Sequence, residues 1–110
     1  MNAAPIDFDG PEALREPLQA ALARVVDPEL ALSITDLGLV YRLQVDDAGA
    51  RVRMTMTSPA CPVIDLIVED VENELDRVLP PGYAIAVEVC WEPAWTPDRM
   101  SERARRFLQP

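Results

Sequence analysis

Hydrophobic and polar positions recur with two different periods along this chain, and the two periods predict both helices and strands. Apolar residues at helical spacing form one face of residues 17–26 and a longer stripe over residues 64–78. Such spacing is typical of helices that pack one side against a core. Strict alternation of apolar and polar residues instead predicts strands over residues 39–45, 51–57 and 84–91.

Prolines, glycines and short polar residues mark the boundaries between these elements. Pro28 disfavours helical geometry at the residue before it, so the first helix is expected to end there. Residues 46–49 (Asp-Asp-Ala-Gly) predict a hairpin turn between the first two strands, and residues 80–82 (Pro-Pro-Gly) end the second helix. Thr96 as an N-cap followed by Pro97 predicts a last helix near the end of the chain.

The order of elements is helix, strand, strand, helix, strand and helix, which predicts a small α+β domain. We expect helices packed on a mostly antiparallel sheet of three to four strands, with residues 30–35 as a source of the fourth. A chain of 110 residues fits one domain with one core. Residues 1–16 are expected to form a loose N-terminal arm, which leaves residues 17–110 as the single domain.

Charge and composition exclude several classes of protein. The chain has 19 acidic and 10 basic residues and a net charge of −9. Nucleic acids and anionic membranes both attract basic surfaces, so neither is expected as a partner. The chain has no histidine, which removes the usual general base and the Cys-His pair of thiol enzymes. Two cysteines cannot supply the four thiolates of a zinc or iron–sulfur site from one chain.

The first residues of the chain do not have the features of a targeting segment. They have no basic region followed by an apolar one, and no run approaches the roughly 20 apolar residues of a membrane span. We therefore expect a cytoplasmic protein whose cysteines are reduced.

The loop between the second strand and the second helix holds the candidate reactive thiol. Pro62 suits the first position of a helix, which would place Cys61 at or next to the N-cap. Free backbone N–H groups and the helix dipole favour an anion there, so the thiol of Cys61 is expected to be acidic enough to act as a nucleophile or metal ligand. The alternative interpretation is a small buried cysteine that only fills space.

A loop rich in turn-forming residues follows the first helix and holds three carboxylates. Asp27, Glu29 and Asp36 fall within ten residues and are candidates for a metal site or for partner docking. The structural alternative is that Asp27 caps a turn, Asp36 accepts backbone N–H bonds and Glu29 is solvated; for Asp27 this alternative is favoured. Gly38 is expected to adopt a backbone angle that other residues resist.

Four blocks of sequence, taken together, resemble the metal–sulfur cluster assembly factor family, which includes SufT-like and PaaD-like proteins. The blocks are Asp27-Pro28-Glu29, residues 36–41 (Asp-Leu-Gly-Leu-Val-Tyr), residues 54–62 (Met-Thr-Met-Thr-Ser-Pro-Ala-Cys-Pro) and residues 91–101 (Trp-Glu-Pro-Ala-Trp-Thr-Pro-Asp-Arg-Met-Ser). Each block alone is weakly specific, but the four in order cover about residues 18–108.

The resemblance implies a role in maturing iron–sulfur proteins, as a carrier or an adaptor. It implies a reactive cysteine at Cys61, acidic motif residues at Asp27, Glu29 and Asp36, and a loop threonine at Thr57. The cofactor would be iron or an iron–sulfur cluster, held transiently, and the partners would be an iron–sulfur scaffold and apo client proteins.

The chain departs from the family pattern in several places. Ala31 and Ala94 replace residues expected to be bulkier or proline, Glu92 replaces an aspartate, and Cys90 has no counterpart. The sequence ends at Pro110 without the cysteine-rich tail of PaaD-like members, which favours the SufT-like branch.

Three functions remain open, although an enzyme is not the expected one. In the first, Cys61 holds iron or a cluster together with Cys61 of a second protomer in a homodimer, and Asp36 or Glu29 completes the site. In the second, the acidic loop and the Trp95 segment dock a scaffold or client, and Cys61 only packs. In the third, Cys61 is the nucleophile of a thiol enzyme or of a redox sensor, which the absence of histidine disfavours.

Overall fold

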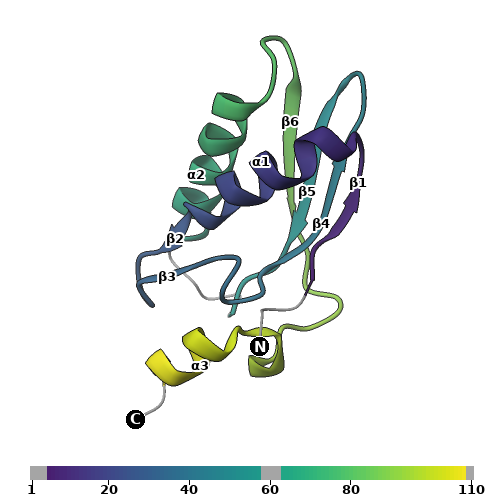
Figure 1. Ribbon diagram of the computed structural model, residues 1–110. Coiled ribbons are helices and arrows are strands. Elements are labelled where there is room, and N and C mark those ends of the chain that lie inside the picture. The colour runs from purple at the N-terminus through teal and green to yellow at the C-terminus, as the bar shows by residue number, and fades with distance from the viewer. Residues whose placement is uncertain (1–4, 58–62, 109–110) are drawn as a thin grey trace.

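The computed structural model describes residues 5–57 and 63–108. Its elements, in chain order, are β1 (Asp7–Asp9), α1 (Glu12–Ala23), β2 (Val26–Asp27), β3 (Leu32–Ser33), β4 (Val40–Val45), β5 (Gly49–Met54), α2 (Ile64–Val78), β6 (Ala84–Val89), the short 3-10 helix η1 (Pro97–Arg99) and α3 (Glu102–Leu108). The α+β class is confirmed, and α2 has the bounds of the predicted apolar stripe (Figure 1).

The main sheet is mixed, and the expectation of a mostly antiparallel sheet was wrong. Its strand order is β1-β4-β5-β6. Only the β4–β5 hairpin is antiparallel, whereas β1 pairs with β4 and β5 pairs with β6 in parallel. The physical reason is that α2 carries the chain back to the starting end of the sheet between β5 and β6, and such a crossover connection makes parallel neighbours.

Residues 30–35 do contribute a strand, but it lies outside the main sheet. It is the two-residue β3, which pairs antiparallel with β2 in a separate small sheet. The fourth strand of the main sheet is β1 instead. The predicted first helix also ends earlier than expected, because Val26 and Asp27 belong to β2.

The expectation of a loose arm over residues 1–16 was wrong for the part that is described. Residues 7–9 form β1, in register with residues 42–44 of β4. Helix α1 begins at Glu12, so Pro17 lies inside it and does not start it. The sequence signal was weak because residues 12–16 carry only two apolar side chains, the adjacent Ala13 and Leu14, and no repeating apolar face.

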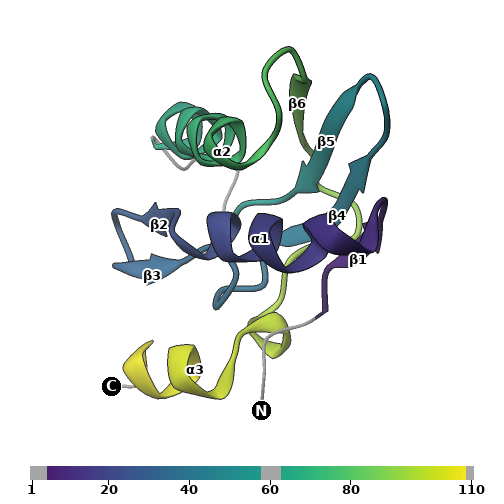
Figure 2. The same ribbon diagram turned by 45° about the horizontal axis from the view of Figure 1, so that its top comes forward.

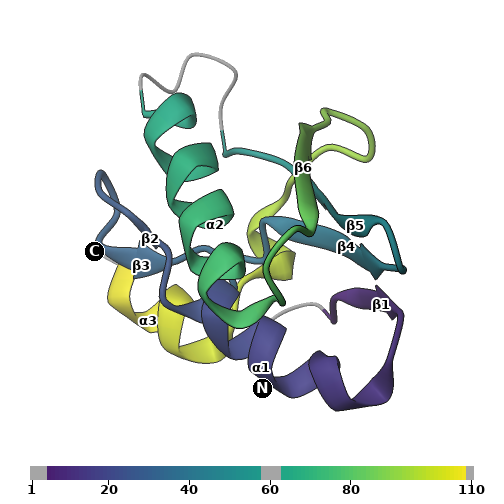
Figure 3. The ribbon, with the colours of Figure 1, turned by 90° about the horizontal axis from the view of Figure 1, so that it is seen from above.

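The core lies between the sheet and two helices. Helices α1 and α2 pack side by side over one face of the sheet, and α3 lies beyond one end of the sheet, away from α2 (Figures 1 and 2). The predicted apolar positions are buried, among them Leu22 on α1, Met54 on β5 and Leu75 on α2. Seen from above, the strands lie to one side of both helices, so the opposite sheet face carries no helix in the described part of the chain (Figure 3).

The last helix is interrupted. The backbone is extended at Met100, between η1 and α3. Ser101 then caps α3, because its Oγ accepts the backbone N–H of Ala104 at 3.1 Å. None of the helices within residues 5–57 and 63–108 is long and apolar enough to cross a membrane.

Candidate functional site

Asp27, the first acid of the candidate cluster, is used to hold a turn. Its side chain is buried, with 3% of the residue exposed. One carboxylate oxygen accepts the backbone N–H of Glu29 at 2.9 Å and that of Leu30 at 3.3 Å. This is the Asx-turn geometry in which aspartate replaces a backbone acceptor, so the interpretation of Asp27 as a turn cap is confirmed. Pro28 lies exposed within the same turn.

Asp36, the third acid, binds the end of the chain. Its Oδ1 accepts the hydroxyl of Ser101 at 3.1 Å, and its Oδ2 pairs with the guanidinium of Arg103 at 2.6 Å. Its backbone carbonyl also accepts the N–H of Ser101 at 2.8 Å. We expected Asp36 to be a metal ligand or an acceptor of backbone N–H groups; its carboxylate instead accepts a hydroxyl and a guanidinium.

At Gly38 the loop that holds Asp36 closely approaches the end of the chain at Arg99. Its φ is +72°, as expected, and a Cβ built there would lie 2.4 Å from the carbonyl oxygen of Arg99. The Nε of Arg99 donates to the carbonyl of Gly38 at 2.8 Å, and its guanidinium lies over the ring of Tyr41, 4.3 Å from the centroid. Only a residue without a side chain fits at this position.

Trp95 completes this arrangement. Its indole N–H donates to the carbonyl of Leu37 at 2.7 Å, and the hydroxyl of Tyr41 donates to the carbonyl of Pro93 at 2.6 Å. Residues 93–105, which we call the C-terminal segment, are therefore bound to residues 36–41. Two of the four blocks that carry the family resemblance thus bind each other, a pairing that sequence spacing alone does not reveal.

Ser101, Arg99 and Arg103 are the residues that the sequence interpretation missed. Arg103 pairs with Asp36, and Arg99 donates to the carbonyl of Gly38. The available signal was the isolated Gly38 inside an apolar run, which indicates close backbone contact but not with which segment.

Glu29 and Thr57 differ from Asp27 and Asp36 in their contacts. Glu29 is exposed, and within the described residues no side chain pairs with its carboxylate. Thr57 is half-buried and is the last described residue after β5. Of the three acids, Glu29 alone keeps a carboxylate that no described contact occupies.

Cys61 and Pro62 lie outside the described residues, so the predicted role of Cys61 is untested by the geometry. The N-cap residue of α2 is Val63 and the helix begins at Ile64, which differs from the expected helix start at Pro62. The remaining cysteine, Cys90, is half-buried and carries a free thiol. Across residues 5–57 and 63–108, no group of three or more cysteine or acidic side chains could hold a metal ion.

One ionisable group with a shifted pKa lies away from this region. A hydrogen bond from Arg24, at 2.7 Å, is the main cause that lowers the pKa of Glu74 on α2, and the charge of Arg77 adds to it. The contact joins the end of α1 to α2 and is structural.

Comparison with known proteins places the whole chain in a family. A profile described as "Iron-sulfur cluster assembly protein" matches residues 15–89. The chain is 43% identical, over 88% of its length and 95% of the relative's, to the Fe-S protein maturation auxiliary factor YitW of Bacillus subtilis. It is also 43% identical to the Fe-S protein maturation auxiliary factor SufT of Staphylococcus aureus, over 76% of this chain and 96% of that one.

A solved structure supports the same relationship. The crystal structure of a domain of unknown function, DUF59, from Bacillus anthracis superimposes with a TM-score of 0.81 at 43% identity, covering 88% of this chain and 92% of that one. The resemblance noted from the four sequence blocks is confirmed. The chain belongs to the iron–sulfur cluster assembly protein family.

Proposed function

We propose that this protein is a SufT-like maturation factor that helps deliver iron–sulfur clusters to client proteins, with Cys61 as the group that contacts the cargo. The proposed role rests on one observation. Two relatives named Fe-S protein maturation auxiliary factors are each 43% identical to this chain, which spans 95% and 96% of their lengths.

The contacts of the acidic residues support a thiol as the principal ligand. The carboxylates of Asp27 and Asp36 hold the fold, so using either one for iron would break hydrogen bonds that are already formed. Glu29 is exposed and unoccupied by described contacts, and it is the acid that can assist without such a cost. Thiolate is also the usual ligand of iron–sulfur clusters.

The ligand count favours a site shared between two copies. One chain offers Cys61, Glu29 and the half-buried Cys90, which is fewer than the four thiolates of a stable cluster. We infer that Cys61 of two protomers hold the cluster in a homodimer. Incomplete ligation suits a protein that must release its cargo, and the cluster is therefore a substrate that passes through, not a resident cofactor.

The test is anaerobic reconstitution with iron and sulfide, followed by visible absorption and by size-exclusion chromatography. We expect the wild type to gain a weak chromophore that elutes with a dimer. Cys61→Ser should lose it, Cys90→Ser should keep it, and Glu29→Gln should weaken it. A chromophore that survives Cys61→Ser but is lost in Cys90→Ser would refute the assignment. No chromophore in any variant would leave an adaptor that brings scaffold and client together without holding the cluster.

A further inference from the structure

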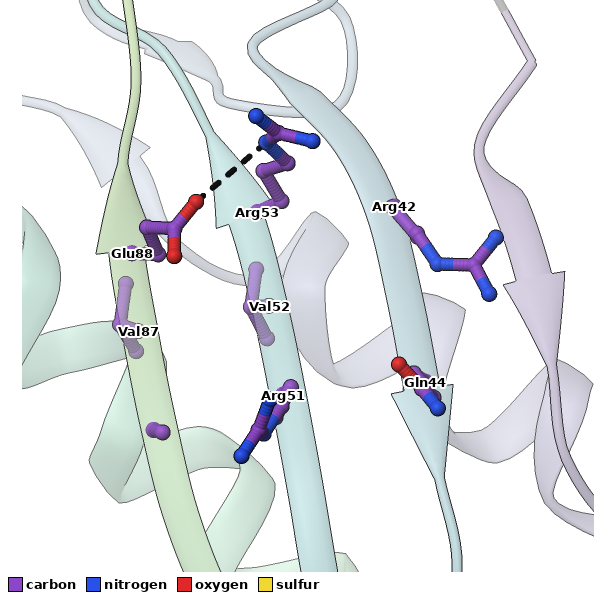
Figure 4. Close-up of a pocket in the computed structure, with 8 residues that line it drawn as sticks. Arg42, Gln44, Arg51, Val52, Arg53, Val87 and Glu88 are labelled. Carbon is purple, nitrogen blue, oxygen red and sulfur yellow. Dashed lines mark ion pairs between the residues drawn. The ribbon is translucent and has the colours of Figure 1, made fainter.

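The sheet face that α1 and α2 leave uncovered carries a second candidate binding surface. A shallow hollow of about 610 Å³ lies over β4, β5 and β6. Figure 4 shows the polar side chains that project into it from neighbouring strands. We call this surface the arginine face, and it consists of Arg42, Gln44, Arg51, Arg53, Ala86 and Glu88.

Strand register arranges these side chains in two rows across the sheet. In the first row, Asp7, Arg42, Arg53 and Glu88 are successive neighbours. This row is balanced, because Arg42 pairs with Asp7 and Arg53 pairs with Glu88 at 3.4 Å. The positive charges of this row already have partners at both edges of the sheet.

The second row is not balanced. Its successive members are Asp9, Gln44, Arg51 and Ala86. Asp9 contacts Arg42 of the first row at 3.2 Å, so it is not available to Arg51. The two neighbours of Arg51 are therefore a neutral amide and a methyl group. Neither neighbour carries a negative charge, so neither can form an ion pair with the exposed guanidinium.

Arg51 is exceptional among the basic residues of this protein. The chain has no lysine, and all ten arginines lie within the described residues. Nine of them contact a carboxylate or a backbone carbonyl. Arg51 alone has no such contact with any described residue. In a chain with 19 acidic residues, Arg51 is thus the one guanidinium of the described residues that is available to a carboxylate from another molecule.

We propose that the arginine face docks an acidic segment of a partner protein, with a carboxylate of that segment on Arg51. Guanidinium binds carboxylate in a planar, two-point geometry, and the amide of Gln44 can donate to the same group. The ion pair of Arg53 with Glu88 is exposed on both sides, so a ligand carboxylate can exchange with Glu88 at small cost. The segment can then engage Arg51 and Arg53 together.

Other anions fit this surface less well. A nucleic acid extends beyond the face, so its phosphates would meet the carboxylates of Asp7, Asp9 and Glu88 at the two edges, whereas a short acidic segment can be confined to the strands between them. Compact phosphate sites use converging backbone N–H groups, whereas those of β4 and β5 are committed to the sheet ladder. An extended peptide matches a shallow hollow that crosses three strands.

The test uses the metal-free full chain and a short fluorescein-labelled peptide of alternating glutamate and serine, followed by fluorescence anisotropy at low salt. We expect weak binding that Arg51→Gln reduces about threefold to fivefold, the value of one exposed ion pair. Arg77→Gln is the matched control, because it removes the same charge from an exposed side chain on α2. A general attraction between charges would be weakened equally by Arg51→Gln and Arg77→Gln, whereas docking on the arginine face should be weakened more by Arg51→Gln. A peptide with glutamine in place of glutamate is the second control, because it lacks the carboxylates.

The proposal is overturned if the wild type does not bind the peptide, or if Arg51→Gln and Arg77→Gln weaken binding equally. It is also overturned if inorganic phosphate displaces the peptide at matched concentration, which would indicate a small-anion site, or if Arg51→Gln only converts a dimer to a monomer. Thermal melting of Arg51→Gln checks that the fold is intact. The measurement needs no iron, so its failure would leave the proposal for Cys61 untouched.

Discussion

Gly38 offers a sharp test of how the C-terminal segment is held. Replacement by alanine has two effects at this position. The φ of +72° places the new side chain in the left-handed region, and its Cβ would lie 2.4 Å from the carbonyl oxygen of Arg99 and 2.7 Å from the Cβ of Arg99. Because the nearest atom is backbone, the C-terminal segment has to move away.

The structure contains a matched control for the first of these effects. Gly82 has a φ of +90°, but a Cβ built there meets nothing within 4 Å. Gly82→Ala therefore adds backbone strain alone, at about 1–2 kcal/mol. Gly38→Ala adds the same strain and also loosens the hydrogen bonds at Gly38 and Leu37, which contribute about 0.5–1.5 kcal/mol each. We expect Gly38→Ala to lower the free energy of unfolding by about 2–5 kcal/mol in total.

Two optical signals distinguish local release from global unfolding. Both tryptophans of the chain, Trp91 and Trp95, lie in or next to the C-terminal segment, so their fluorescence reports on its contacts. Far-ultraviolet circular dichroism reports on α1, α2 and the sheet. In urea, Gly38→Ala should shift the fluorescence transition to lower concentration than the dichroism transition, whereas Gly82→Ala should shift both together. Equal effects of the two substitutions on both signals would refute the reasoning.

Three further substitutions test the remaining contacts. Trp95→Phe removes the indole donor to Leu37 and should cost about 0.5–1.5 kcal/mol in urea unfolding; no loss would mean that the indole N–H bonds equally well to water. Asp27→Ala leaves two backbone N–H groups without their acceptor and should cost about 1–3 kcal/mol by the same measurement, and an unchanged urea midpoint would contradict the Asx turn. The pKa of Glu74 is lowered in the folded state, mainly by the hydrogen bond from Arg24, so its stabilisation is present above its ordinary pKa of 4.5 and is lost as the pH falls through the folded pKa. Glu74→Gln should therefore reduce the fall in urea midpoint below pH 4.5, and an unaltered pH profile would refute this assignment.

The elements that the sequence predicts well are those with a long repeating pattern. The apolar stripe of α2 gives its bounds correctly, and the alternation over residues 39–45 and 51–57 predicts the β4–β5 hairpin to within a few residues. Strand β1 has only three residues and two aspartates, so no pattern indicates it; its stability comes from pairing with β4. Strand direction depends on where α2 returns the chain, which local periodicity does not encode.

Residues of the candidate site were also predictable only where their partners lie nearby in the sequence. Asp27 could be predicted because its partners are two and three residues away. Asp36 could not, because its partner Arg103 is 67 residues away and an arginine near a helix end has a local explanation as well. Trp95 was a candidate for docking a partner in one of the three open functions, and in the structure its N–H is bound within the chain. The cysteine that the sequence indicates most strongly, Cys61, still awaits its experiment.

The mixed sheet also determines how cooperatively this protein folds. The two parallel pairings each join residues 35 positions apart in the chain, Asp7 with Arg42 and Gly49 with Ala84, and each such closure contains one helix. The β4–β5 hairpin is the only local pairing in the main sheet, and an isolated two-stranded hairpin is marginally stable in water. The β4–β5 hairpin therefore becomes stable only when β1 and β6 have paired with it, together with the helices α1 and α2 that connect them to it. Contacts of such long range slow folding, and they couple the two ends of the sheet into one transition.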